Sequence, residues 1–272
     1  MSAELPKGEH IRLELDAGVL TLELHRPEVR NAMSLQTLAE IEVVFDAVKD
    51  RRDVRAIVLR GAGGNFCSGG DIKDMAMARG AKAAEGQPDP MAVVNRRFGA
   101  VISKVDRAPQ AIVAVLEGAV LGGGFGLACV ADVAIAKADT QFGLPETGLG
   151  VPPAQIAPFL VARLGPSRAR WLALTGARFD GHLAQTIGLV HVVVEGDDEL
   201  TQALAGTLKQ IKRCAPGAIA ATKRIMLQVG AVDRDRLLDE AAGLFAEAAR
   251  GPEGMEGMMA FVQKRKPNWA DE

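Results

Sequence analysis

Short runs of apolar residues, two of them preceded by a segment with helical spacing, constrain the fold of this chain more than any other feature. The runs at 56–59, 111–116 and 133–136 contain no polar residue. Runs of this length without alternation are typical of strands buried on both faces in a parallel sheet. The segments 35–49 and 91–105 precede the first two runs and space their apolar residues as a helix does. The sequence therefore predicts an α/β fold with parallel strand pairing.

Other segments extend this prediction. Residues 10–24 alternate apolar and polar side chains around Asp16-Ala17-Gly18, which predicts a β-hairpin. Ser34 is placed to cap the helix that follows it. The polar segment 80–90 predicts a loop, and 189–194 a short strand. The rest of the second half predicts a helical tail, with helices at 154–163, 166–174, 198–212, 216–229, 233–249 and 252–263.

Composition excludes several classes of protein. The net charge of −2 and pI near 6.1 give no basic excess for nucleic acid. No stretch reaches the ~18 apolar residues of a membrane span, and MSAELPKGEH has no secretory pattern. Cys67, Cys129 and Cys214 form no CxxC pair, so neither a disulfide framework nor a metal site is expected. We expect a cytoplasmic protein, since free cysteines fit a reducing compartment.

Two glycine-rich turns follow buried strands, at 65–72 (NFCSGGDI) and 118–126 (GAVLGGGFG). Glycine lets backbone approach a ligand closely, and amides at a helix start stabilise negative charge. Two such turns from neighbouring strands would direct two N–H groups at one oxygen, as in an oxyanion hole. The alternative is that both are simply tight turns of an α/β fold. Neither turn matches a P-loop or GxGxxG, so a nucleotide site is not expected.

Glu146 is the strongest candidate for acid/base chemistry. Its neighbours in FGLPETGLG are apolar or small, and burial in such surroundings raises the pKa of a carboxyl. The alternative is a solvated carboxylate at a helix start. None of the four histidines lies in a Ser-His-Asp context, and GxSxG is missing. Arg26 is either a phosphate contact or a solvated loop charge, and Lys264 to Lys266 either complement a helix end or contact an anionic cofactor.

Five motifs in order carry a resemblance. HRPEVRNAMS, FCSGGDI, LGGGFGLA, FGLPETGLGVPP and AFVQKRKP occur in this sequence over about residues 13–267. Together they resemble the crotonase (enoyl-CoA hydratase/isomerase) superfamily. The resemblance implies an α/β ClpP/crotonase-like fold, a ββα superhelix with two roughly perpendicular sheets in a core of residues 1–200. It also implies a helical trimerisation region at 201–272, a homotrimer or hexamer, and an acyl-CoA substrate without a separate cofactor.

The same resemblance assigns roles to residues. The amides of Gly70 and Gly123 would form the oxyanion hole, and Glu146 would be the acid/base residue. Phe261 and Lys264 would reach CoA, in many members that of a neighbouring subunit. The expected contacts with CoA and the acyl group are Arg26, Val29, Arg30, Ala32, Cys67, Ser68, Gly69, Gly70, Asp71, Ile72, Leu121, Gly122, Gly123, Pro145, Glu146, Leu149, Phe261 and Lys264.

This chain departs from the family at Gly126. The first of the two glutamates of a standard hydratase falls there, at the family spacing of 20 residues before Glu146. Three activities stay open. PETGLGVPPAQIAPFLVARLG most resembles hydratases of 3-branched glutaconyl-CoA esters, namely isohexenylglutaconyl-CoA (terpene degradation) and methylglutaconyl-CoA (leucine degradation), and this is the preferred interpretation. The alternatives are a Δ3,Δ2-enoyl-CoA isomerase with a single glutamate and a non-catalytic acyl-CoA-binding protein.

Overall fold

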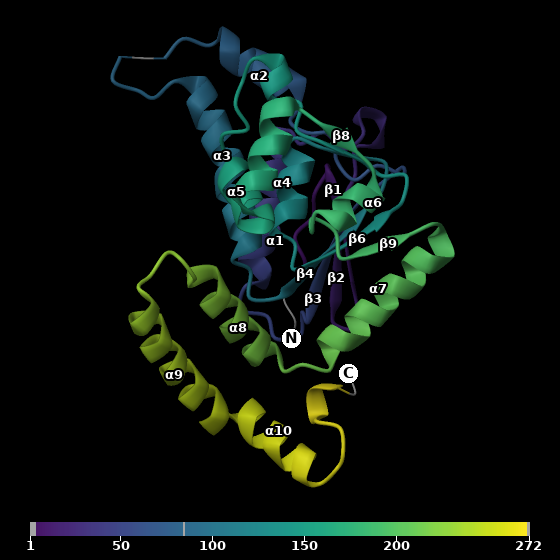
Figure 1. Ribbon diagram of the computed structural model, residues 1–272, viewed down its shortest axis with the longest axis vertical. Helices are drawn as coiled ribbons and strands as arrows, with labels where there is room; N and C mark the ends of the chain where they lie inside the picture. The colour runs from purple at the N-terminus through teal and green to yellow at the C-terminus, as the bar shows by residue number, and fades with distance from the viewer. Residues whose placement is uncertain (1–3, 84, 271–272) are drawn as a thin grey trace.

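A mostly parallel six-stranded sheet forms the centre of the molecule (Figure 1). The computed structural model describes residues 4–83 and 85–270. The sheet has the order β1-β2-β3-β4-β6-β9, and every neighbouring pair except β1 with β2 is parallel. Its strands are β1 (Ile11–Asp16), β2 (Val19–Leu24), β3 (Ala56–Gly61), β4 (Ala111–Leu116), β6 (Val133–Lys137) and β9 (Val192–Val194). The predicted α/β fold, hairpin and parallel pairing are confirmed.

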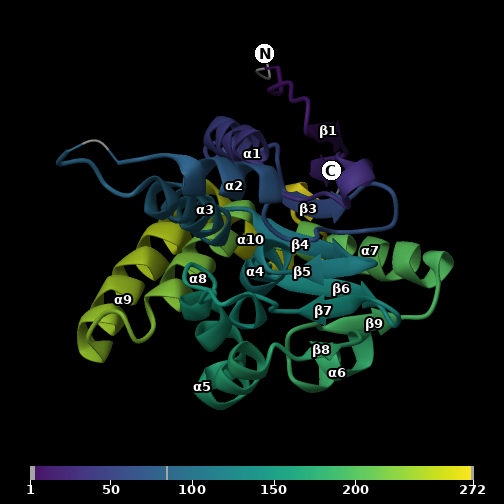
Figure 2. The same cartoon turned by 90° about the horizontal axis from the view of Figure 1, so that it is seen from above.

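Helices bury both faces of this sheet, which explains the uninterrupted apolar runs. On one face Ile57 and Ile112 join the core made with α1 (Leu35–Val48) and α3 (Pro90–Asp106). On the other face Val58 and Val113 pack with α7 (Asp197–Lys212). Figure 2 shows α1 and α3 together on one side of the strands, with α7 apart from them. Alternate residues of one strand therefore serve two separate cores.

The predicted Ser34 cap of α1 is confirmed. The Thr37 amide donates to Ser34 Oγ at 3.1 Å, and the Ser34 amide donates back to Thr37 Oγ1 at 3.3 Å. Such a reciprocal capping box satisfies two amides that the helix itself leaves unpaired. The same Ser34 hydroxyl lies 2.8 Å from His10 Nδ1, so the hairpin and the start of α1 are joined.

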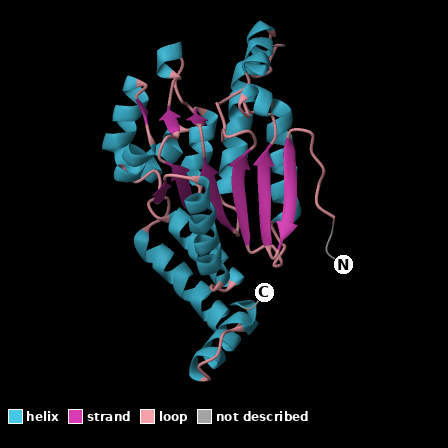
Figure 3. Cartoon of the chain, turned by 90° about the vertical axis from the view of Figure 1, so that its right-hand side faces the viewer, coloured by secondary structure: helices cyan, strands magenta, loops and turns pink. Residues whose placement is uncertain are grey.

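A second sheet, which the crotonase resemblance implied, has three strands that the local sequence pattern did not predict. It has the order β5-β7-β8, with β5 (Ala119–Leu121), β7 (Gln141–Gly143) and β8 (Arg178–Phe179). Strands this short carry no readable alternation. Phe142, Phe179 and Phe125 of α4 (Gly123–Val130) bury their rings against one another, with centroids 5.5–6.4 Å apart. Figure 3 shows the short strands at the opposite end of the molecule from the C-terminal helices.

The helical tail follows the prediction closely. Its helices are α5 (Ala157–Thr175), α6 (Gly181–Thr186), α7, α8 (Pro216–Gln228), α9 (Arg234–Arg250) and α10 (Pro252–Val262). Gly165 interrupts α5 with φ 74°, at the predicted break between two helices. The sequence pattern missed α6 and α2 (Ile72–Gly80), which bury few apolar residues. No helix within the described residues is long and apolar enough to cross a bilayer.

Buried cations attach the C-terminal helices to the sheet. Lys223 of α8 is 9% exposed, and its Nζ lies 2.7 Å from Asp132 Oδ2, which also accepts from the Ile112 amide. Arg55, before β3, donates to the carbonyls of Lys212, Cys214 and Trp269. These bonds fix the α7–α8 linker and the chain end on the edge of the sheet where β3 and β4 begin.

Replacing Lys223 with Met is expected to lower the free energy of unfolding by about 3 kcal/mol, because Asp132 keeps a part-buried charge without its partner. Denaturant-induced unfolding measures this. The control is Lys209→Met on α7, an exposed lysine. Equal losses for both variants would show that the Lys223–Asp132 pair does not attach α8.

Candidate active site

Three segments meet at the start of α4. The Cys67 amide donates to the Ala119 carbonyl and the Leu121 amide donates to the Cys67 carbonyl, each at 2.9 Å. On the other side of β5, the Gly122 amide donates to the Gly143 carbonyl at 3.1 Å. Thus β5 joins the predicted loop 65–72 to the strand that leads into Glu146. The two glycine-rich turns are neighbours in space, as the sequence predicted.

Glycine is required where these segments approach one another. Gly69 has φ 112°, and a β-carbon on it would lie 3.5 Å from the Leu121 carbonyl oxygen. Gly122 has φ 50° and ψ −115°, and its β-carbon would lie 3.6 Å from Gly69 Cα and 3.0 Å from Glu146 Oε1. A side chain at Gly122 would therefore meet both the Gly69 backbone and the Glu146 carboxyl, and glycine lets these three segments approach one another.

Two backbone amides beside this junction have no acceptor among the described residues. Met33 pairs with Gly70 in a parallel bridge that uses the Gly69 carbonyl and the Asp71 amide, so the Gly70 N–H points away from Met33. Gly123 is the first residue of α4, whose first-turn amides have no acceptor within the helix. These are the two predicted oxyanion-hole residues, and both adjoin the Gly69–Gly122 contact.

The Glu146 side chain is half-buried, and one of its carboxyl oxygens is buried without a hydrogen-bond partner. Its Oε2 is inaccessible and has no hydrogen-bond partner among the described residues. Burial raises the pKa of Glu146, opposed only by a hydrogen bond from its own backbone. The next residue holds the loop in place, since Thr147 Oγ1 donates to the Ala173 carbonyl of α5 at 2.8 Å. A buried polar group left unpaired, with a raised pKa, is typical of a functional site.

The position of the missing glutamate is filled by apolar side chains. A β-carbon on Gly126 would lie 2.6 Å from Ile102 Cδ1, 3.2 Å from Ile156 Cγ1 and 3.5 Å from Phe98 Cζ. Phe98 also lies 3.0 Å from a β-carbon placed on Gly123. Sequence reasoning missed these three side chains, because helical spacing marks Phe98 and Ile102 only as core residues. The wall of the site at Gly126 is therefore apolar.

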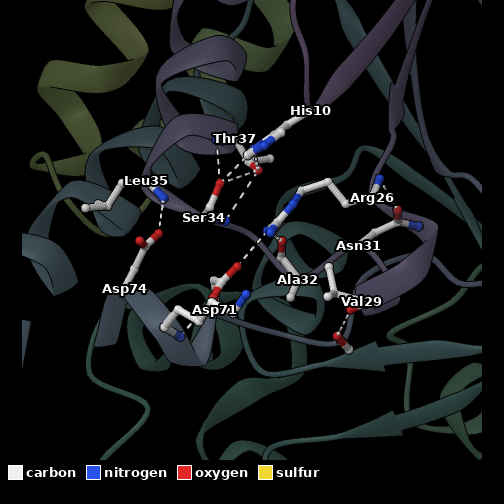
Figure 4. Close-up of polar contacts among 12 residues, drawn as sticks. His10, Arg26, Val29, Asn31, Ala32, Ser34, Leu35, Thr37, Asp71 and Asp74 are labelled. Carbon is white, nitrogen blue, oxygen red and sulfur yellow. Dashed lines mark hydrogen bonds and ion pairs between the residues drawn. The ribbon is translucent and has the colours of Figure 1, made fainter. Parts of the chain in front are cut away.

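The predicted CoA loops pair with each other (Figure 4). Arg26 Nη1 donates to the Ala32 carbonyl at 2.7 Å and to Asp71 Oδ2 at 2.8 Å, with side chains 16% and 10% exposed for Arg26 and Asp71. A solvated Arg26 is therefore wrong, and its guanidinium points inward. Ser68 Oγ donates to the Val29 carbonyl at 3.1 Å. Contact of these residues with CoA stays a prediction.

The remaining predicted residues differ in exposure. Ile72 and Leu149 are 81% and 74% exposed, and Val29 and Arg30 also face solvent. Leu121 and Pro145, which directly precede Gly122 and Glu146 in the chain, are half-buried.

Phe261 and Lys264 stand apart from these segments. Phe261 is 85% exposed at the end of α10, and α10 lies at the opposite end of the molecule from α2 (Figure 1). The structure therefore does not bring Phe261 and Lys264 to this chain's own site, and their predicted contact with a neighbour's CoA stays a prediction.

The two remaining candidates for chemistry are the Cys67 thiol and clusters of metal-ligating side chains. Burial raises the pKa of the Cys67 thiol to about 12, so it is no thiolate nucleophile at neutral pH. Among residues 4–83 and 85–270, no group of three or more His, Cys, Asp or Glu side chains is arranged to hold a metal ion.

An α/β core in which a partly buried carboxyl with a raised pKa lies beside two unpaired backbone amides is typical of an enzyme active site. The chain belongs to the enoyl-CoA hydratase/isomerase family, whose model matches residues 14–272. It is 33% identical to mevalonyl-coenzyme A hydratase of Aspergillus fumigatus over 261 residues, 92% of this chain and 91% of that protein.

Solved structures agree with this family. Pseudomonas aeruginosa AtuE is 57% identical with a TM-score of 0.93, covering 96% of this chain and 100% of that one. An enoyl-CoA hydratase/isomerase from Marinobacter aquaeolei is 52% identical with a TM-score of 0.93, covering 96% and 99%. The predicted crotonase superfamily, its fold and an enzymatic function are confirmed.

Replacing Gly122 with Ala is expected to lower kcat/KM about 100-fold, because the β-carbon displaces Glu146 Oε1 and a positive φ is strained. Steady-state kinetics measure this, with Gly148→Ala as control, since a β-carbon there meets nothing within 4 Å. An unchanged kcat/KM in Gly122→Ala would show that this contact does not position the carboxyl.

Proposed function

We propose that this protein hydrates the C2=C3 bond of a 3-branched glutaconyl-CoA ester, isohexenylglutaconyl-CoA or methylglutaconyl-CoA. Hydratase activity as such is supported by the family and its relatives. The observation that carries the substrate class is the apolar filling at Gly126, which leaves no carboxyl at the position of the first family glutamate. The relative from Aspergillus is named for the mevalonyl ester, whose acyl group is also branched at C3.

The mechanism uses two amides and one carboxylate. The thioester carbonyl oxygen accepts hydrogen bonds from the Gly70 and Gly123 amides. The Glu146 carboxylate takes a proton from water as the oxygen forms a bond to C3. The C2=C3 electron pair moves to the thioester, whose enolate oxygen the amides stabilise. Glu146 then returns the proton to C2, so the product gains one water and the enzyme is unchanged.

A second group must orient the water. The resemblance implies that in a standard hydratase the glutamate at the position of Gly126 helps to hold the water, and Gly126 has no side chain to do so. We assign this task to the distal carboxylate that a glutaconyl ester itself carries. Simple enoyl-CoA esters lack that carboxylate and are expected to be hydrated slowly.

One observation favours an isomerase as the second candidate. A single carboxyl against an apolar wall suffices to move a proton between C2 and C4, a reaction that needs no water. A non-catalytic acyl-CoA-binding protein is disfavoured, because burying Glu146 unpaired is costly without a use in chemistry.

We also propose that the protein assembles as a homotrimer or hexamer in the cytoplasm, with CoA entering only as part of the substrate. The support is the set of exposed apolar side chains on and beside α8–α10: Met226, Leu227, Val229, Leu238, Phe245, Met255, Met258, Met259, Phe261 and Val262. Many exposed apolar side chains on helices that contact one another are typical of subunit interfaces.

Ultraviolet absorbance of the conjugated enoyl thioester tests the activity. Crotonyl-CoA, a 3-enoyl-CoA and 3-methylglutaconyl-CoA are offered separately, each also to Glu146→Gln. Loss of absorbance with the glutaconyl ester, and little with crotonyl-CoA, is expected. A rise with the 3-enoyl ester would identify an isomerase. Rapid hydration of crotonyl-CoA would contradict the role of the distal carboxylate.

A further inference from the structure

Two chain segments form a short parallel ladder beside the site. The Ser68 amide donates to the Arg30 carbonyl at 3.0 Å, and the Met33 amide donates to the Gly69 carbonyl at 2.8 Å. The Asp71 amide donates to the Met33 carbonyl at 2.9 Å. Gly70 lies inside this ladder. Its N–H direction is therefore fixed by the hydrogen bonds of its two neighbours.

Arg26 closes the end of this ladder. One nitrogen, Nη1, donates both to the Ala32 carbonyl of the first segment and to the Asp71 carboxylate of the second. Figure 4 shows the guanidinium between these two oxygens. Asp71 Oδ1 accepts in turn from the Lys73 amide at 2.8 Å and caps α2. The ion pair therefore joins three elements around the Gly70–Asp71 peptide.

The backbone of Arg26 is fixed by hydrogen bonds to Asn31. Its amide donates to Asn31 Oδ1 at 2.8 Å, and the Asn31 side chain donates to the carbonyls of Ala62 and Asn65 at 2.9 and 2.6 Å. Asn31 is 1% exposed and has φ 56°. Arg26 thus reaches Asp71 from a fixed anchor.

We propose that Arg26 and Asp71 are positioning residues that hold the Gly70 N–H toward the substrate carbonyl. Resting on the proposed oxyanion role of Gly70, this gives Arg26 a function other than contact with a CoA phosphate. Burial opposes ionisation of Asp71, but the hydrogen bonds from Arg26 and the Lys73 amide outweigh it and keep the pKa of Asp71 below its usual value. The ion pair is therefore intact at neutral pH.

Arg26→Met is expected to lower kcat about 10- to 100-fold, because a displaced donor loses much of its transition-state stabilisation. Asp71→Asn keeps the side-chain shape and removes the charge, so a smaller loss is expected. The double variant should be no worse than Arg26→Met, because both changes break one interaction. Arg12→Met on β1, an exposed arginine, is the matched control and should keep full activity.

A spectroscopic readout separates positioning from folding and from CoA binding. The probe is butyryl-CoA labelled with ¹³C at the thioester carbonyl, a saturated ester that cannot be hydrated. In the wild type, infrared difference spectra should show the carbonyl stretch at lower frequency when bound. In Arg26→Met, at saturating ligand, most of this shift should be lost, while the Kd for free CoA changes little.

Three outcomes overturn the proposal or its basis. An intact carbonyl shift in Arg26→Met with a greatly weakened Kd for CoA would make Arg26 a CoA-binding residue. An intact shift with unchanged kcat would show that the pair positions nothing. No shift in the wild type would instead contradict the oxyanion role of Gly70, and so the proposed function. If Arg26→Met fails to fold, Asp71→Asn provides the same test.

Discussion

Replacement of Glu146 with glutamine is expected to lower kcat for hydration by about 10²–10⁴-fold, with a small change in KM. The amide preserves the shape of the side chain, but it neither accepts the proton of water nor delivers one to C2. The side chains at Gly126 cannot replace Glu146 in these proton transfers, since Phe98, Ile102 and Ile156 are apolar. Steady-state kinetics on the glutaconyl ester measure the loss.

Stability supplies the control for this variant. Burial raises the pKa of Glu146. Such a carboxyl stabilises the fold most when protonated, below its unfolded pKa, and that contribution is lost as pH rises through the folded pKa. Glutamine stays neutral, so Glu146→Gln should be at least as stable as the wild type at neutral and alkaline pH. If the variant is instead less stable than the wild type at neutral pH, its loss of activity would be explained by unfolding.

The wild-type pH profile follows from the same shift. Because Glu146 acts first as a base, kcat/KM should fall with decreasing pH through a pKa above that of an ordinary glutamate. In Glu146→Gln the residual kcat/KM should no longer fall with decreasing pH in this range. If kcat/KM of the variant still falls with decreasing pH, a group other than Glu146 causes the fall.

Gly126→Glu, which introduces the first of the two family glutamates, is expected to destabilise the fold by several kcal/mol and to give no gain in hydration of crotonyl-CoA. The new β-carbon would lie 2.6 Å from Ile102 Cδ1, and the side chain would be added among Ile102, Ile156 and Phe98, which are apolar. Denaturant unfolding and crotonyl-CoA kinetics measure the two expectations.

Two controls separate the causes. Gly126→Ala adds only the β-carbon, which the flexible end of Ile102 can yield to, so a small loss of stability is expected. Gly126→Gln has nearly the size of glutamate without its charge, and the difference between the two variants reports the cost of burying the charge. A gain of crotonyl-CoA hydration in Gly126→Glu would show that the apolar wall accommodates a water-holding carboxylate.

Much of the fold could be predicted because its signals are local. The run 111–116 contains only apolar residues since β4 is buried on both faces, and Ser34 marks the start of α1 through its own capping bonds. Strands of two or three residues such as β8 could not be predicted. They form because Phe179 packs on Phe142 and Phe125, contacts that no local pattern contains.

The sequence by itself determined the longer strands and most of the helices, the family, and the candidate carboxyl Glu146, because each rests on residue type and spacing along the chain. Only the tertiary structure decided that one oxygen of Glu146 is buried without a partner and that Gly126 faces apolar side chains. It alone turned Arg26 inward onto Asp71, 45 residues away in the chain. The physical reason is that burial, desolvation and charge pairing depend on which distant segments meet, and residue spacing does not encode those distances.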